Sequence, residues 1–360
     1  MGGALLACGG QTDRAARAQA TARAQALDAA ERLVSRDPAR AATLFGDIAE
    51  SEDYPEEDRL LARYRQGELC QAVGDLDGAA GHFTAVAVST HVERAGLAAF
   101  RGARLQFVDR GDYTGGRTAL LAVARTRPET LGAVQAIETL ARARPGDRDH
   151  GAWVTAALAV LAEKNTQLAP AAAWWKAHLE VNSLGELAAA RASLRGLIAR
   201  HPGHPRVGSA LWLLGDLLRR QGAWRRASGV YDTLSRLEPE RGWFIGSNRE
   251  RRVDDAILTS GRLRLHRMDD PVGAMDRFER LLAAFPESVL ADDAAYGLAR
   301  AMAAAGRAED ARRALTDFIQ RYPESRFTRR AKAVLGGAPW PTDVPDGVES
   351  ALVWRASVRP

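Results

Sequence analysis

Four prolines that each end an apolar stretch recur at nearly regular intervals along the second half of the chain. They are Pro202, Pro239, Pro286 and Pro323, separated by 37, 47 and 37 residues. Internal periods of this size indicate a solenoid, in which one supersecondary unit stacks on the next. A single core stops growing at roughly 250–300 residues, whereas each unit of an array packs only on its neighbours. The 360 residues therefore fit one repeat array.

Alignment on these prolines reveals a template for a helical hairpin. Seventeen residues before each proline stands a turn residue, twelve before stands alanine, and eight and five before stand large apolar residues. The turn residues are Gly185, Gly222, Asp269 and Gly306, and the alanines are Ala190, Ala227, Ala274 and Ala311. Glycine suits a helix C-terminus because it adopts the left-handed backbone without strain, alanine lets two helices approach closely, and proline stops the second helix. The large residues, three apart, share one helical face.

The same template continues toward the N-terminus, in segments 60–91 and 97–128 and in a weaker first unit that ends with Ala41, Phe45 and Ile48. The stretch 129–168 is expected to form two helices without the template residues. Alanine, leucine and arginine dominate the composition, and all three favour helix. The sequence therefore predicts an all-α protein of about eight helical hairpins.

The template resembles the tetratricopeptide repeat. Segment 208–239 matches best, with Leu211, Leu214-Gly215, Leu218, Ala227, Tyr231, Leu234 and Pro239 at the family's consensus offsets, and Trp174 stands at the consensus tryptophan of segment 171–202. The resemblance implies a right-handed α-solenoid that binds proteins without catalysing a reaction. It also implies that the first helix of each hairpin lines a concave groove.

Two further patterns resemble bacterial envelope lipoproteins. Phe285-Pro-Glu-Ser288 and Tyr322-Pro-Glu-Ser325 are similar to joins in the accessory lipoprotein of the β-barrel assembly machinery and in the periplasmic partner of the Tol–Pal system. Leu5-Leu6-Ala7-Cys8 resembles a lipobox, which implies a lipid anchor on Cys8 at the periplasmic face of the outer membrane. No basic residue precedes Cys8, so a complete signal peptide would need a start further upstream. The alternative is a frayed, cytoplasmic N-terminus.

These patterns divide the chain into five parts. They are a lipoprotein-like N-terminus and tether (1–22), N-terminal repeats (23–128), a degenerate helical pair (129–168), C-terminal repeats (169–335) and an extended proline-rich tail (336–360).

Candidate partner-binding residues follow from the groove that the resemblance implies. In the family, the fifth residue of each repeat faces this groove. The residues at that position are Tyr64, Arg101, Trp175, Trp212, Thr259 and Tyr296. The residues at neighbouring groove positions are Arg219, Arg220, His266, Arg267 and Arg300. Aromatic residues and arginine dominate interface energies, which favours a peptide partner with some acidic character. The alternative, weighted equally, is that Trp175 and Trp212 pack between repeats. Trp243 and Phe244, in the insertion that lengthens one spacing, form either a docking knob or a segment folded onto the convex face.

The sequence contains no catalytic, metal-binding or cofactor-binding motif, so we expect no enzyme, cofactor or metal. The net charge of +5 is spread along the chain, which argues against nucleic acid as a partner. The leading hypothesis is a scaffold for a membrane-associated assembly. The alternatives are a soluble cytoplasmic adaptor and, less favoured, the superhelical part of an enzyme similar to a lytic transglycosylase.

Overall fold

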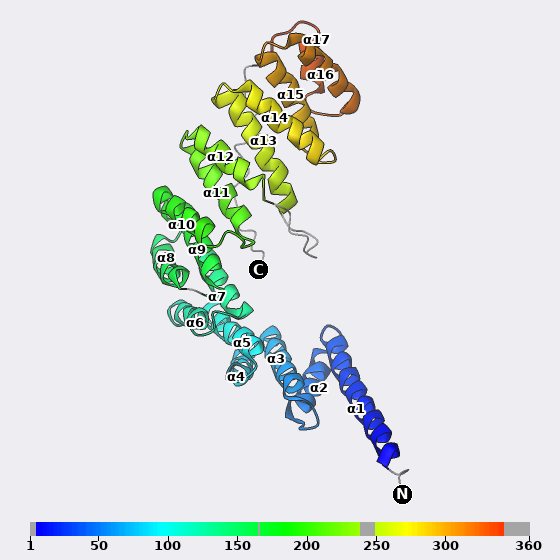
Figure 1. The fold of residues 1–360 in the computed structure, drawn as a ribbon. Helices are drawn as coiled ribbons and strands as arrows, with labels where there is room; N and C mark the ends of the chain where they lie inside the picture. Colours follow the sequence, from blue (N-terminus) through cyan, green and yellow to red (C-terminus); the bar gives the residue numbers. More distant parts are fainter. Residues whose placement is uncertain (1–4, 165, 238–248, 342–360) are drawn as a thin grey trace. The chain divides into compact units, whose positions relative to one another are not determined.

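The computed structural model describes residues 5–164, 166–237 and 249–341, and every regular element in these ranges is helical. The helices fall into two compact units, Met1–Trp175 and Lys176–Pro360. Seventeen α-helices are described, and α1 to α16 pair in chain order into eight hairpins, with α17 following the last (Figure 1). The predicted all-α fold of about eight hairpins is confirmed.

The first unit is a succession of hairpins in which each helix packs on its neighbours in the chain. Its helices are α1 (Leu5–Leu33), α2 (Pro38–Glu50), α3 (Glu56–Val73), α4 (Leu76–Ala87), α5 (Val92–Arg104), α6 (Tyr113–Thr126), α7 (Leu131–Arg142) and α8 (Arg148–Glu163). Helices α7 and α8 occupy the stretch that lacks the template residues. Helix α9 (Ala169–Leu179) contains the boundary between the units.

The second unit has the same hairpin order. Its helices are α10 (Leu187–Arg200), α11 (Val207–Arg220), α12 (Trp224–Leu234), α13 (Arg249–Arg267), α14 (Pro271–Ala284), α15 (Ala291–Ala304), α16 (Ala308–Arg321) and α17 (Thr328–Leu335). Helices α11 to α16 each pack on the next, and the first helices of successive hairpins, α11, α13 and α15, also contact one another.

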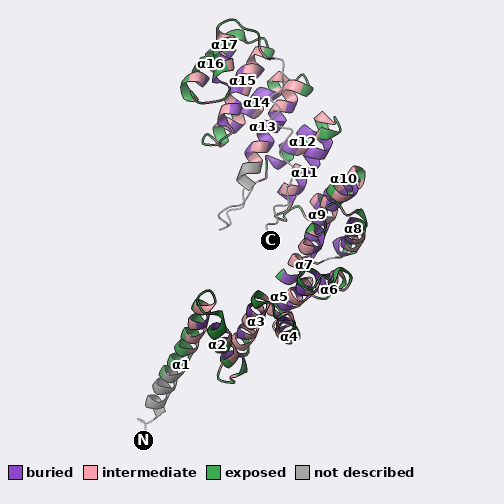
Figure 2. Cartoon of the chain, turned by 180° about the vertical axis from the view of Figure 1, so that it is seen from behind, coloured by how far each residue is buried: buried purple, intermediate pink, exposed green. Residues whose placement is uncertain are grey.

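The template positions have the burial that the alignment predicted. Ala190, Ala227 and Ala274 are fully buried and Ala311 is 2% exposed, as expected where two helices approach closely. The large residues of the second helices are buried as well, and Figure 2 shows how buried stretches recur along the hairpins. The four turn residues Gly185, Gly222, Asp269 and Gly306 all have positive φ, between 52° and 80°.

Two π-helical segments continue first helices of the hairpins, at Leu105–Asp109 after α5 and at Glu180–Leu184 after α9. The template did not indicate them. π-Helical turns inside longer helices often mark functional positions. Here each segment is followed closely by a glycine with positive φ, which is Gly111 after the first segment and Gly185 after the second.

The structure differs from the sequence expectations at two further points. Residues 5–22, assigned to a tether, are helical as part of α1, in keeping with their alanine- and arginine-rich composition. The proline-rich tail does not leave the unit directly as an extended arm, because Trp340 packs on the last hairpin, against Tyr296. None of the described helices is both long enough and apolar enough to cross a membrane.

The serines of the two Pro-Glu-Ser joins do not occupy the N-cap positions of α15 and α17, which are Leu290 and Phe327 and make no side-chain cap hydrogen bond. Each serine instead ties two hairpins together. Ser288 Oγ donates a hydrogen bond to Asp254 Oδ2, and Ser325 Oγ donates one to Asp292 Oδ2, both at 2.6 Å. Each join thus connects the start of one hairpin to the first helix of the preceding hairpin.

Candidate functional site

The first helices of the hairpins in the first unit are joined by a ladder of polar contacts. Arg101 on α5 donates hydrogen bonds to the Tyr64 hydroxyl of α3, at 3.0 Å, and to Glu68 Oε1, at 2.8 Å. Arg65 continues the ladder, with contacts of 2.7 Å to both Glu68 and Glu31 of α1. The structure therefore brings together Tyr64 and Arg101, two candidate residues one repeat apart. Acidic and basic groups alternate in this ladder.

Helix α11 holds three candidate residues, and each of them has a partner within the unit. The ring of Trp212 packs against Tyr231 of α12, with centroids 5.3 Å apart. Arg219 and Arg220 both contact the buried carboxylate of Asp216, at 2.6 and 2.7 Å. Burial, and then the charge of Asp216, raise the pKa of the Tyr231 hydroxyl. Of these groups Arg220 is the most open to solvent, with half of its side chain exposed.

Trp175 is only 4% exposed, so its ring is part of the packing of the first unit. The guanidinium of Arg142 lies over the ring, 5.3 Å from its centroid. This position agrees with the packing alternative for Trp175. Trp212 lies in the second unit, and its ring packs within that unit against Tyr231.

Basic side chains gather where α13 and α15 run side by side in the second unit. Asp293 of α15 accepts hydrogen bonds from Arg262 of α13 and from Arg326, the latter at 2.7 Å. His266 stands one helical turn beyond Arg262. Burial, and then the charges of Arg300, Arg262 and Arg267, lower the pKa of His266 to about 4. We call Arg262, His266, Arg267, Arg300 and Arg326 the basic face.

Guanidinium groups surround His266 on the basic face. Asp293 bonds two of its arginines, and each of the three charges that act on His266 is a guanidinium. His266 is neutral near pH 7 because its pKa is about 4. Arg267 also lies over the ring of Trp224, 5.2 Å from the centroid. Arg267 is exposed and Arg300 is partly exposed, so an anion from outside can reach the face.

Tyr296, a candidate partner-binding residue, is covered by the chain's own residues. It is 3% exposed. Phe327 stacks on its ring at 4.7 Å with an interplanar angle of 7°, and Trp340 packs at 5.9 Å. On α15, Asp293, Tyr296 and Arg300 are spaced by three and four residues, so they share one face of the helix. Tyr296 thus adjoins the basic face and is itself covered by Phe327, which precedes α17, and by Trp340, which follows it.

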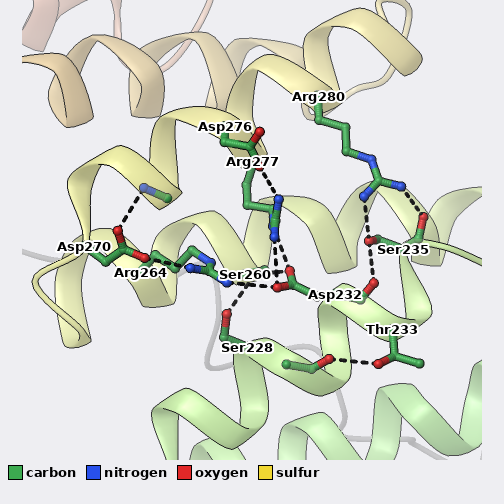
Figure 3. Close-up of polar contacts among 12 residues, drawn as sticks. Ser228, Asp232, Thr233, Ser235, Ser260, Arg264, Asp270, Asp276, Arg277 and Arg280 are labelled. Atoms are coloured by element: carbon green, nitrogen blue, oxygen red, sulfur yellow. Dashed lines mark hydrogen bonds and ion pairs between the residues drawn. The ribbon is translucent and has the colours of Figure 1, made fainter.

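A buried polar cluster that the sequence analysis did not identify joins α12, α13 and α14 (Figure 3). Asp232 accepts hydrogen bonds from Arg277 Nε at 2.8 Å, Arg277 Nη2 at 3.0 Å, Arg264 Nη2 at 2.9 Å and Ser260 Oγ at 2.7 Å. Ser260 also shares a hydrogen bond of 2.9 Å with Ser228. Burial by itself would raise the pKa of Asp232, but the bonds from Arg277, Ser260 and Arg264 outweigh it and lower the pKa.

The position of this cluster indicates a structural role. Its members lie on both sides of the insertion between α12 and α13, and Arg264 also bonds Asp270 at the start of α14. Arg280 adds a bond of 2.8 Å to the carbonyl of Ser235 at the end of α12. The cluster therefore fixes α13 and α14 against α12. The pairs that join Asp232 to α13 and α14 are 28 to 45 residues apart, and no periodic signal in the sequence points to them.

Comparison with protein families gives one match, which is the tetratricopeptide repeat, over residues 265–334. This region consists of tetratricopeptide repeats. It runs from the end of α13 to α17 and includes part of the basic face. Tetratricopeptide arrays present extended surfaces that bind other proteins. The template residues and the hairpin order of the matched region recur in the hairpins before it.

Solved tetratricopeptide structures are similar to this chain only at a distance. A tetratricopeptide repeat protein from Parabacteroides merdae has 14% identity and a TM-score of 0.34, covering 78% of this chain and 99% of that one. BtubC from P. vanneervenii has 16% identity and a TM-score of 0.33, covering 91% and 95%. The tetratricopeptide domain of P58(IPK) has 15% identity and a TM-score of 0.28, covering 88% and 96%. Scores this low give no information on function. Among curated proteins there is no match.

Several candidate positions lie outside the described residues. The insertion residues Trp243 and Phe244 are among them, as is the side chain of Cys8, whose backbone is part of α1. Lipidation at Cys8 and docking through the insertion stay predictions. No group of three potential metal ligands comes together in the described ranges 5–164, 166–237 and 249–341.

Proposed function

We propose that the chain is a non-catalytic protein-interaction scaffold, and that its basic face takes an acidic segment of the partner. The observation that supports this proposal is the accumulation of guanidinium groups around His266, where Asp293 is the carboxylate bonded to Arg262 and Arg326. Arginine pairs strongly with carboxylates because its planar fork donates two parallel hydrogen bonds. The tetratricopeptide repeats of residues 265–334 supply the rigid array that holds the face.

Residues that test this proposal must be accessible and must not hold the unit together. Trp212 and Arg219 pack against Tyr231 and Asp216, so their replacement by alanine would disturb the unit as well as the surface. The double charge reversal Arg267→Glu/Arg300→Glu changes more accessible groups. Arg195→Glu, at an exposed position of α10, is the matched control.

The experiment places a photo-crosslinking residue at position 220, identifies the captured protein by mass spectrometry, and repeats the binding with that protein purified. We expect Arg267→Glu/Arg300→Glu to weaken binding by at least tenfold, and Arg195→Glu to leave it unchanged. Equal binding by both variants would overturn the proposal. Competition by duplex nucleic acid alone, with no protein captured, would assign the face to a different class of partner.

We also propose that the scaffold is a lipoprotein of the bacterial cell envelope, anchored through Cys8 at the periplasmic face of the outer membrane, where it serves a membrane-associated assembly. The support is the lipobox-like Leu5-Leu6-Ala7-Cys8 together with the two Pro-Glu-Ser joins. Membrane fractionation with mass analysis of the N-terminus, on the gene expressed with its natural upstream sequence, tests this. A diacylglyceryl mass on Cys8 is expected. An unmodified cysteine in the soluble fraction would favour the cytoplasmic adaptor instead.

A further inference from the structure

The acidic groups beside the basic face are engaged by two of its arginines. Asp293 accepts a hydrogen bond from Arg262, and both of its oxygens accept hydrogen bonds from Arg326, at 2.7 and 3.0 Å. Asp255 of α13 also attracts Arg262 electrostatically. Two carboxylates thus offset the charges of these two arginines.

The surroundings of His266 are different. The charged groups that the described part of the chain places around its ring are Arg300, Arg262 and Arg267, and none of them is acidic. Arg267 follows His266 on α13, and its guanidinium lies over the ring of Trp224, 5.2 Å from the centroid. A contact of this kind holds a guanidinium without supplying a counter-charge. The ring of His266 therefore lies in a positive potential.

This potential acts on any charge that is placed beside the ring. Burial and the potential together lower the pKa of His266 to about 4, because both disfavour a second proton on the imidazole. The same potential stabilises an anion, and the energy is proportional to the charge of that anion. A dianion therefore gains about twice as much as a carboxylate does at the same place.

The side chains at this place have the donors that a phosphoryl group needs. Arg267 is exposed, and Arg300 and His266 are partly exposed. A guanidinium presents a planar fork of N–H donors that matches phosphate, and a neutral imidazole has one N–H donor. A phosphoryl group offers three acceptor oxygens and carries a charge close to −2 above about pH 7. Because α13 and α15 are in contact, one such group can bridge the two helices.

We propose that the basic face binds a phosphoserine or phosphothreonine in the acidic segment of the partner, with Arg267 of α13 and Arg300 of α15 on the phosphoryl oxygens and His266 as a further donor. This specificity rests on the proposed function, since the phosphorylated residue belongs to the segment that the face takes. Binding to the scaffold then depends on phosphorylation of the partner.

The test uses fluorescent peptides, titrated by anisotropy into the full-length chain above about pH 7, where the phosphoryl group is a dianion. All have the sequence Gly-Glu-Gly-X-Gly-Glu-Gly, in which X is phosphoserine, O-sulfoserine or aspartate. The sulfate ester has the same terminal oxygens as the phosphate ester but a single charge, so it separates the effect of charge from that of shape. We expect the phosphoserine peptide to bind at least tenfold more tightly than the other two.

Two further measurements locate the bound phosphoryl group. Arg267→Gln/Arg300→Gln should remove the preference for phosphoserine, and Arg195→Gln, at an exposed position of α10, should keep it. In NMR spectra of the chain with isotope-labelled histidine, the phosphoserine peptide should raise the titration midpoint of His266, because a bound dianion favours the protonated ring. Circular dichroism checks that each variant is folded.

Several results would each overturn the inference. They are equal binding of the phosphoserine and sulfoserine peptides, absence of binding by all the peptides, and a preference for phosphoserine that survives Arg267→Gln/Arg300→Gln. Full competition by inorganic phosphate at the concentration of the peptide would likewise assign the site to a free anion and overturn the assignment to a peptide.

These failures are distinguishable from failure of the proposed function. An acidic segment can bind without a phosphate, so the scaffold function would still be decided by the crosslinking experiment. Conversely, the phosphoserine peptide can bind as expected while the captured partner binds Arg267→Glu/Arg300→Glu as tightly as it binds the wild type. In that case the phosphoryl site stands and the proposed function fails.

Discussion

At the scale of single residues, the two helices of several hairpins approach closely where a glycine faces an aromatic ring. A methyl group added at Gly261 of α13 would lie 2.7 Å from the ring of Phe278 in α14. The same relation holds between Gly215 and Tyr231, also at 2.7 Å. Because these rings are buried, they have no room to withdraw.

We therefore expect Gly261→Ala to destabilise the second unit by about 1–3 kcal/mol, the usual cost of overpacking a core. Gly229→Ala is the matched control, since nothing lies within 4 Å of the added methyl group in α12. It should raise the free energy of unfolding by about 0.5–1 kcal/mol, because alanine is the better helix former. Urea unfolding measures both. If Gly261→Ala left the free energy of unfolding unchanged, the two helices would be able to move apart at no cost.

A second prediction at this scale concerns Asp232, the carboxylate shared by Arg277, Arg264 and Ser260. Asp232→Ala should destabilise the second unit by about 2–3 kcal/mol, because it removes the carboxylate that two partly buried guanidiniums share, and these keep only Asp270 and Asp276 as acidic partners. Asp317→Ala, at an exposed position, should have little effect on unfolding.

The contribution of Asp232 also depends on pH. Its pKa is lowered in the folded protein, so its stabilising contribution is complete above the unfolded value of about 3.9 and is lost as pH falls through the folded pKa. The difference in unfolding free energy between wild type and Asp232→Asn should shrink below about pH 4. A difference that stays constant down to pH 2 would contradict this assignment.

At the scale of elements, the turn between the two helices of a hairpin requires a left-handed residue. Three of the four template turns in the second unit have glycine there, and the fourth has Asp269, with φ of 52°. A side chain in this conformation costs about 1–2 kcal/mol. Asp269 therefore retains strain that Gly185, Gly222 and Gly306 avoid.

Accordingly, Asp269→Gly is expected to stabilise the second unit by about 0.5–1 kcal/mol, less than the full strain because glycine loses more entropy on folding. The reverse change, Gly306→Ala, should destabilise it by about 1 kcal/mol for the same reason. Thermal unfolding of the two variants should shift in opposite directions. Shifts of the same sign would show that the turn conformation does not determine the effect.

At the scale of the whole molecule, the stability of a repeat array is set by each repeat and by its contacts with adjacent repeats. Each hairpin contacts mainly the hairpins before and after it, so a local loss of stability should weaken adjacent hairpins and fade with distance. The two compact units are the natural limits of such effects.

This behaviour can be measured with the Gly261→Ala variant. Amide hydrogen exchange should accelerate in α13, α14 and α15 and, to a lesser degree, in α12 and α16, while α1 to α6 keep the protection of the wild type. Uniform acceleration along the chain would instead indicate one cooperative unit.

The sequence by itself determined the hairpin pattern, because burial in a repeat array recurs with the period of the repeat. The alanines at Ala190, Ala227 and Ala274 and the left-handed turns at Gly222 and Gly306 could be predicted for that reason. Only the tertiary structure decided where the polar side chains bond. Asp232 and Arg277 are 45 residues apart, and nothing periodic connects them. The Ser288–Asp254 and Ser325–Asp292 hydrogen bonds recur at spacings of 34 and 33 residues, so the repeated serine was visible in the sequence, whereas its partner became known only from the fold. Burial of Tyr296 beneath Phe327 and Trp340 likewise required the fold, because a template position specifies which side of a helix a residue faces but not what covers that side.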